Sequence, residues 1–196
     1  MKRLISLALA ALSLPLLSMA QDTQYNNSPI SDFNLGRYLG TWYEIARFDH
    51  SFERGMDNVM AEYLLRDDGK IDVLNSGWKN GEYKVAEGKA KQPDPVKDPA
   101  HLEVSFFLFF YSDYNVMMLD DAYQVALVGS KSPKYLWILS RTPEVSDKVM
   151  DLVLEEASGR GYDIDNLIWV DQSANIEARS KRITPFLRSS WSSANA

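Results

Sequence analysis

A series of short segments in which apolar and polar residues alternate restricts the fold of this 196-residue chain more than any other pattern in it. The segments lie at 41–48, 58–66, 70–76, 83–91, 101–107, 113–119, 123–129 and 135–142. Turn-forming residues separate them, for example Asp68-Gly69 and Asn80-Gly81. Alternation predicts strands with one buried face, and short connections predict antiparallel neighbours. The sequence therefore predicts an all-β fold, an eight-stranded antiparallel up-and-down barrel without free strand edges.

A helix and a ninth strand should follow. Thr142-Pro143-Glu144 supplies a cap, a proline and an early acid for a helix start. Apolar residues then recur at helical spacing up to Gly159 or Gly161, namely Val149, Leu152, Val153 and Ala157. The segment "NLIWVDQ" predicts the ninth strand. We expect a barrel domain at 33–172 with one C-terminal helix packed outside, a polar leader at 21–32 and a flexible polar tail at 173–196.

The first 20 residues have the pattern of a secretory signal peptide. Lys2 and Arg3 precede an apolar run that Pro15 interrupts, and Ser18 and Ala20 are small residues that fit a cleavage site. A membrane anchor or a core helix is the alternative, but the run is short for a span of roughly 20 apolar residues. We expect cleavage near Ala20 and export of the remaining chain.

The amino-acid composition restricts the cellular compartment and the kinds of partner that we expect. The chain has no cysteine, so it has neither disulfides nor the residue that carries the lipid of a bacterial lipoprotein. We therefore expect a soluble periplasmic or secreted protein that is not lipid-anchored. The 21 basic residues fall to 19 without Lys2 and Arg3, against 27 acidic residues, which gives a formal charge of −8. That charge argues against binding to nucleic acid, which rests on neutralising phosphates.

Three stretches resemble the bacterial lipocalins of the Blc type. They are "GTWYEIARFDHSFERG", "AEYLLRDDGKIDVLNSG" and "YLWILSRTPEVSD", and the resemblance extends from about Phe33 to Gln172. It implies a lipocalin barrel with a structural motif of Gly40, Trp42 and Arg141, in which the indole closes one end beneath the guanidinium. Such a cation–π contact is worth about 1 to 2 kcal/mol when partly desolvated. The other end is then open.

One inward anchor per strand predicts the lining of the barrel, because side chains alternate along a strand. Trp42 inward places Glu44 and Ala46 inward, and the family's inward positions have the same parity. The candidate ligand-binding residues are Glu44, Val59, Ala61, Tyr63, Val73, Asn75, Gly88, Leu102, Val104, Phe106, Tyr114, Val116, Val128, Tyr135 and Trp137. The alternative is that they fill a dry core, and a bulge would reverse the parity beyond it.

Aromatic and basic residues are predicted at the open end. The loops there should present Phe52, Trp78, Phe109, Lys131 and Lys134. Apolar residues beside cations suit a lipid with a charged head, and such residues also suit peripheral contact with a membrane surface. A hydrophobic lid over the pocket is the alternative.

The sequence predicts a binding protein and no enzyme. It has no nucleophile elbow, no phosphate-binding loop and no metal-ligand spacing, so we expect neither a cofactor nor a metal. His50 and His101 are interpreted as surface residues. The resemblance implies an exported lipocalin that carries or scavenges fatty acids, lysophospholipids or similar amphipathic molecules, with a role in envelope maintenance or stress. The alternatives are a lipocalin-fold enzyme and an interaction module, and a homodimer is compatible with any of them.

Overall fold

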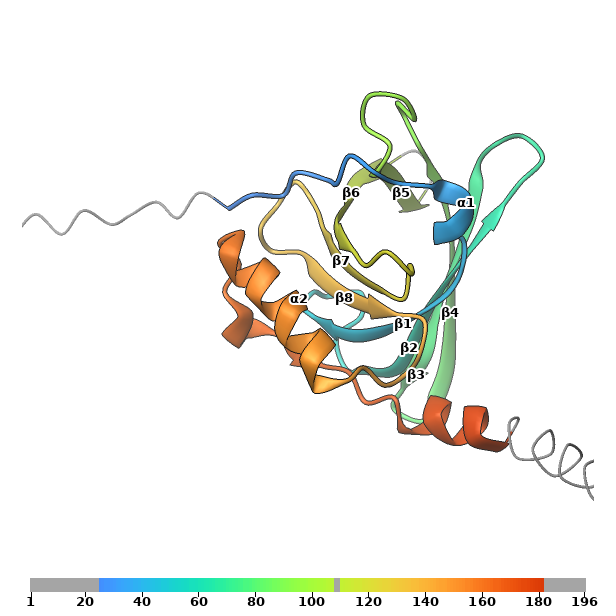
Figure 1. Ribbon diagram of the computed structural model, residues 1–196. Coiled ribbons are helices and arrows are strands. Elements are labelled where there is room, and N and C mark those ends of the chain that lie inside the picture. Colours follow the sequence, from blue (N-terminus) through green and yellow to red (C-terminus); the bar gives the residue numbers. More distant parts are fainter. Residues whose placement is uncertain (1–24, 108–109, 182–196) are drawn as a thin grey trace, which may run out of the picture.

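The computed structural model describes residues 25–107 and 110–181 and contains the predicted barrel (Figure 1). Its strands are β1 (Gly40–Arg47), β2 (Met56–Leu65), β3 (Ile71–Lys79), β4 (Glu82–Lys91), β5 (His101–Phe107), β6 (Phe110–Leu119), β7 (Val125–Gly129) and β8 (Leu136–Ser140). Each pairs antiparallel with the next, and β1 pairs with both β2 and β8. The eight strands therefore close on themselves, as predicted.

Short elements complete the barrel at both ends of the domain. Helix α1 (Leu35–Tyr38) precedes β1, and α2 (Asp147–Gly159) lies outside the barrel beside β7 and β8 (Figure 1). A 3-10 turn, η1 (Ile164–Asn166), leads to β9 (Ile168–Trp169), which pairs with β1. The predicted helix and ninth strand are both present. The helix begins after Ser146 rather than at Pro143.

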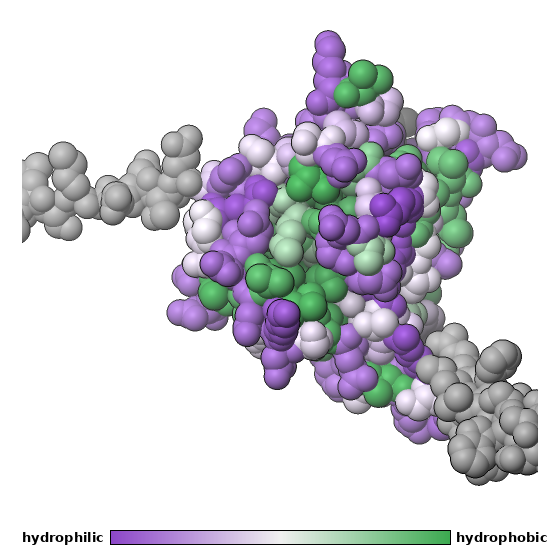
Figure 2. All heavy atoms as spheres, in the orientation of Figure 1, coloured by the Kyte–Doolittle hydropathy of each residue, from purple (hydrophilic) through white to green (hydrophobic). Residues whose placement is uncertain are grey.

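Two hydrophobic layers share the wall of the barrel. Val116, Val128 and Leu139 belong to the layer inside the barrel. Their chain neighbours Met117 and Leu127 belong to a second layer, which packs between the wall and α2. This split is the physical result of side-chain alternation along strands that are covered on both faces. Figure 2 shows that apolar side chains also reach the surface in patches, framed by polar side chains.

A bulge in β1 changes which side chains point inward. The pairing of β1 with β8 shifts register between Glu44 and Ala46. Ala46 then packs in the outer layer, so its predicted inward position is wrong. Arg47 takes the inward side instead, opposite Trp137, and is 2% exposed. One extra residue in a strand reverses the parity of those that follow, which is why simple alternation failed here.

The chain beyond the domain begins with a helix that the sequence pattern did not predict. Residues 173–181 are helical, and the Asn58 Oδ1 accepts from the backbone nitrogens of Ala174 and Asn175, at 2.9 and 3.3 Å. The predicted signal peptide and residues 182–196 lie outside the described residues, as does Phe109. Within the described part of the chain, no helix is long and apolar enough to cross a membrane.

Candidate ligand-binding site

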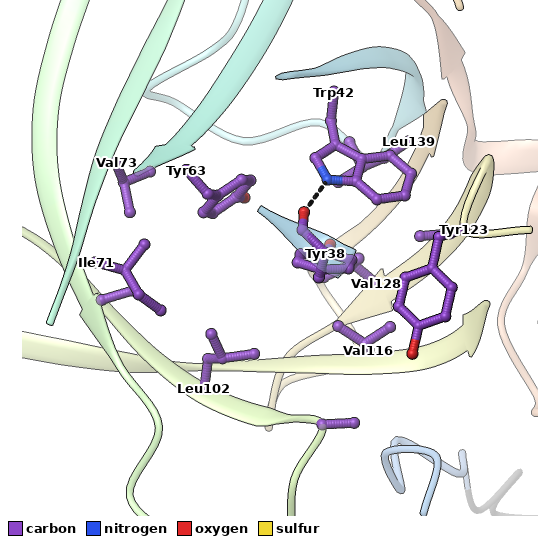
Figure 3. Packing of buried hydrophobic residues seen from close by; sticks show 13 residues of the cluster. Tyr38, Trp42, Tyr63, Ile71, Val73, Leu102, Val116, Tyr123, Val128 and Leu139 are labelled. Carbon is purple, nitrogen blue, oxygen red and sulfur yellow. Dashed lines mark hydrogen bonds between the residues drawn. The ribbon is translucent and has the colours of Figure 1, made fainter. Parts of the chain in front are cut away.

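Trp42 and Arg141 close one end of the barrel. The Arg141 Cζ lies 3.8 Å from the centroid of the Trp42 ring. The Trp42 Nε1 donates to the Tyr38 carbonyl at 2.8 Å, which ties the indole to α1 (Figure 3). The Arg141 guanidinium also donates to the carbonyls of Thr41, Arg37, Tyr38 and Leu39, at 2.7 to 2.9 Å. Gly40, the first residue of β1, has a φ of +94°, a conformation that favours glycine.

Three tyrosine hydroxyls form a floor above this closure. The Tyr63 hydroxyl donates to the Tyr114 hydroxyl at 2.9 Å, and the hydroxyls of Tyr114 and Tyr38 are 2.6 Å apart. Burial raises the pKa of all three, so they stay protonated at physiological pH. The sequence analysis predicted Tyr63 and Tyr114 as ligand-binding residues. The structure instead shows that their hydroxyls bind each other and Tyr38.

The predicted lining residues include a fully buried set and a partly accessible set. Val73, Leu102, Val116 and Val128 are buried in the inner layer with Tyr63 (Figure 3). Four other inward positions keep some solvent-accessible surface, namely Ala61, Asn75, Gly88 and Val104. These four inward residues are therefore not fully covered by protein atoms.

Small residues surround Asn75 in this accessible set. Asn75 on β3 is paired with Ala61 on β2 and with Ala86 on β4, so small side chains flank it on both sides. Gly88 lies beneath the Phe106 ring: a Cβ added to it would come within 2.7 Å of the Phe106 Cδ1. Gly88 therefore supports the close packing of Phe106 more than it offers surface to a ligand.

A buried ionic cluster lies near the open end, where β1 continues into the loop before β2. The Arg47 Nη1 and the Glu44 Oε1 form an ion pair at 2.6 Å. The Arg47 Nη2 donates to the main-chain carbonyls of Glu53 and Met56, at 2.8 and 3.2 Å. Arg47 thereby fastens the loop to the wall of the barrel.

The Glu53 carboxylate contacts three side chains from different parts of the fold. The Glu53 Oε2 accepts from the Trp137 Nε1 at 3.2 Å, and the Oε1 accepts from the Asn75 Nδ2 at 3.4 Å. The His50 Nε2 lies 2.9 Å from the Glu53 Oε2, an ion-pair distance at which the angle does not meet hydrogen-bond geometry. Sequence reasoning did not propose Arg47 or Glu53. Within "RFDHSFERG", Arg47, His50 and Glu53 recur three apart, and that spacing could have indicated such a cluster.

His50 differs from its sequence interpretation as a surface residue. It is 5% exposed and stacks on Phe52 with ring centroids 3.9 Å apart. The centroid of its ring also lies 5.3 Å from that of Trp137. The loop folds back over the opening instead of projecting into water, and so it buries the imidazole.

The two carboxylates of the cluster have opposite pKa shifts. Burial and the charge of Glu53 raise the pKa of Glu44 well above its ordinary value, against the pull of Arg47. Burial also pushes the pKa of Glu53 upward, but contact with His50, the Trp137 hydrogen bond and the Arg47 charge outweigh it and leave it lowered. Glu53 is therefore the stronger acid of the two.

Aromatic rings lead from this cluster to the solvent. Phe52 is 56% exposed, and its ring stacks on Tyr135 with centroids 6.4 Å apart. The Tyr135 ring stacks in turn on Trp137, with centroids 5.9 Å apart. Lys131 and Lys134 are exposed on the loop between β7 and β8. This arrangement agrees with a partly covered opening that carries both apolar and basic groups.

Trp78 lies elsewhere than over the opening. It faces outward on β3, opposite Tyr83 of β4, with ring centroids 5.5 Å apart. Beside this pair a shallow groove of about 270 Å³ runs along the outside of β1–β4; its lining is Thr41, Met60, Glu62, Leu74, Ser76, Tyr83 and Val85.

Comparison with known proteins agrees with this geometry. A family profile described as "Lipocalin-like domain" matches residues 33–172. The outer membrane lipoprotein Blc of Vibrio cholerae is 50% identical over 147 residues, which cover 74% of this chain and 85% of that protein. The protein of the same name from Escherichia coli K12 is 50% identical over 146 residues, covering 73% and 81%. The structure of insecticyanin from Manduca sexta matches with a TM-score of 0.62 at 26% identity, covering 74% and 83%. This chain therefore belongs to the lipocalin family and is of the Blc type.

Proposed function

We propose that this protein is exported and carries or scavenges single-chain lipids in its barrel. Membership of the lipocalins supports ligand binding in general. The observation that carries the lipid proposal is the gradient along the barrel interior. A buried aliphatic layer and a tyrosine floor lie below, small accessible residues lie above, and polar and basic groups lie at the opening. An acyl chain fits the first two zones and a polar head fits the third.

The acyl chain would lie against Val73, Val104 and Val116, with Ala61 leaving room beside them. Burying a CH₂ group is worth about 0.8 kcal/mol, so a chain of several carbons gives substantial affinity without any polar contact. Tyr135 and Trp137 would contact the part of the lipid that leaves the barrel. The exposed rings of Phe52, Phe107 and Phe110 suit transient contact with a membrane from which lipid is taken.

The place of action follows from the leader and from the missing cysteine. The relatives are named as outer membrane lipoproteins, whereas this chain contains no cysteine to acylate. We propose release as a soluble protein in the periplasm or outside the cell. A role in envelope maintenance or stress would follow from such a location.

A buried acid–base pair is the observation that favours a second candidate, a lipocalin-fold enzyme. His50 and Glu53 are in contact at 2.9 Å, close to Glu44 with its raised pKa. We favour binding because both oxygens of Glu53 already accept from Asn75 or Trp137, as expected of a carboxylate that holds structure together.

Native mass spectrometry of protein purified from its own host tests the proposal directly. We expect a mass increment that denaturation removes, and extraction should yield a single-chain lipid. The delipidated protein should then bind fatty acids and lysophospholipids in a titration followed by tryptophan fluorescence. Absence of both co-purified lipid and titratable binding would refute lipid carriage. Recovery of cleaved products from an ester-linked lipid would favour the enzyme.

A further inference from the structure

The unpartnered polar atoms of the interior gather at one place. Among the described residues, the buried side-chain nitrogens and oxygens without a hydrogen-bond partner are the Arg47 Nε, the Asn75 Oδ1 and both ring nitrogens of His50. All three residues contact Glu53, through its carbonyl or its carboxylate. Buried polar atoms are nearly always paired, so a cluster of unpaired ones within a binding barrel indicates a polar group of the ligand.

The kinds of atom define that group. The Arg47 Nε–H can only donate, and the Asn75 Oδ1 can only accept. The orientation of the Asn75 amide follows from Glu53, because an ionised carboxylate requires the NH₂ side to face it and turns the oxygen away. A hydroxyl can accept from Arg47 and donate to Asn75. A carboxylate can only accept, so it cannot satisfy both.

The charges exclude an anion for a second reason. Glu44 and the carbonyls of Glu53 and Met56 already occupy the two terminal nitrogens of Arg47. The cluster holds two carboxylates and one guanidinium, with His50 in contact with Glu53. An incoming carboxylate or phosphate would meet Glu44 and Glu53 without a bidentate cation to pair with.

The small residues beside Asn75 give a polar head room to reach it. Ala61 and Ala86 flank Asn75 in one row across β2, β3 and β4, and Ala86 is exposed. The next row toward the floor is Tyr63, Val73 and Gly88, which offers no free polar group. The polar contact therefore lies one row above the apolar part of the barrel, at the height where an acyl chain would give way to its head.

We infer that the cluster around Glu53, formed by Glu44, Arg47, His50, Glu53 and Asn75, determines which lipid heads bind. It selects lipids whose first polar group is uncharged and carries a hydroxyl, such as an acylglycerol, over free fatty acids. The inference rests on the proposed function, since it assumes that an acyl chain enters the barrel. A charged group further along the head, such as a phosphate, lies outside the cluster, nearer to Lys131 and Lys134. Selectivity for the head thus resides inside the barrel, and not only at its rim.

Four ligands with one acyl chain length test the inference: 1-monooleoylglycerol, oleyl alcohol, oleic acid and methyl oleate. They are titrated into the delipidated mature protein at neutral pH, below their aggregation concentrations. We expect monooleoylglycerol to bind about tenfold tighter than oleic acid, the equivalent of one buried hydrogen bond to a polar group. Oleyl alcohol should also bind tighter than methyl oleate, because only the alcohol can donate to Asn75.

Two variants with a matched control locate the effect. Asn75→Leu should weaken monooleoylglycerol several-fold more than methyl oleate. Glu44→Gln should reduce the difference in affinity, the gap, between monooleoylglycerol and oleic acid, because it removes one carboxylate. Glu62→Gln makes the same chemical change in the outer groove and should leave the gap unchanged. Equal or tighter binding of oleic acid, with no response to either variant, would overturn the inference while leaving lipid carriage intact. Failure of all four ligands to bind would instead refute the proposed function.

Discussion

The Arg141 guanidinium lies 3.8 Å above the Trp42 ring and donates to four main-chain carbonyls around it. Trp42 is fully buried, and its own N–H is bound by Tyr38 of α1. The two side chains therefore join α1 and the adjoining start of β1 to the residue that follows β8, about a hundred positions later. The closed end of the barrel depends on this pair.

Trp42→Ala should consequently reduce stability much more than it affects binding chemistry. Large-to-small changes of buried aromatic residues cost about 3 to 5 kcal/mol. Arg141→Ala should be less than additive with it, because both variants remove the same contact. Chemical denaturation of the two single variants and the double variant measures this. Trp169→Ala is the control, since Trp169 is 55% exposed. Fully additive losses would contradict the pairing.

The depth of the barrel should limit the length of the bound acyl chain. Affinity should rise with each carbon by up to about 0.8 kcal/mol and then level off where the tail reaches the floor of Tyr63 and Tyr114. Ala61→Trp should move the plateau to shorter chains, because Ala61 is paired with Trp42 and faces inward. Fluorescence titration with a fatty acid series measures it, and Ala178→Trp on the exposed face of the C-terminal helix is the control. An unchanged plateau would place the ligand outside the barrel.

Lys131 and Lys134 should influence anionic lipids from outside the barrel. Changing both to Glu should weaken lysophospholipids with a net negative head more than neutral lipids of equal length. Added salt should reduce the difference, because exposed charges are screened over about 10 Å at 0.1 M ionic strength. Lys97 and Lys148 are exposed away from the opening, and changing both to Glu is the control. Equal effects of the two double variants would show that only net charge matters.

The lowered pKa of Glu53 predicts how stability depends on pH. A carboxyl whose folded pKa lies below its unfolded value stabilises the fold above the ordinary pKa of 4.5, and this contribution is lost as the pH falls through the folded pKa. Glu53→Gln should therefore be less stable than the unmodified protein at pH 7, and the difference should shrink below about pH 4. Urea denaturation across this range measures it. Glu155→Gln, on the exposed face of α2, should show no such trend. A gap that stays constant down to pH 3 would contradict ionisation of Glu53 in the folded state.

The mature protein should begin near Gln21 and carry no acyl group. The physical reason is that removal of the apolar leader, as proposed, would leave a chain without a cysteine to take a lipid. Intact-mass analysis of the protein from its own host gives the answer in one measurement. A mass increment that matches acylation, or a retained leader, would contradict soluble release.

The sequence by itself determined the barrel, its outer helix and the division of most strands into an inner and an outer face. These follow from patterns that are local: period-two alternation, turn residues and helical spacing act within a few residues of each other. The pairing of Trp42 with Arg141 came from resemblance to a family, because no local pattern links residues about a hundred positions apart.

Only the tertiary structure decided the polar part of the site. The β1 bulge exchanges Ala46 for Arg47 on the inner face, and it depends on how β1 pairs with β8. The loop after β1 turns inward because Arg47, Trp137 and Asn75, which come from three strands, bind Glu53 at once. His50 is buried for the same reason. From sequence alone, charged residues in a loop are predicted to be solvent-exposed. Their burial is favourable only when partners from distant parts of the chain bind them. Here the closure of the barrel brings those partners together.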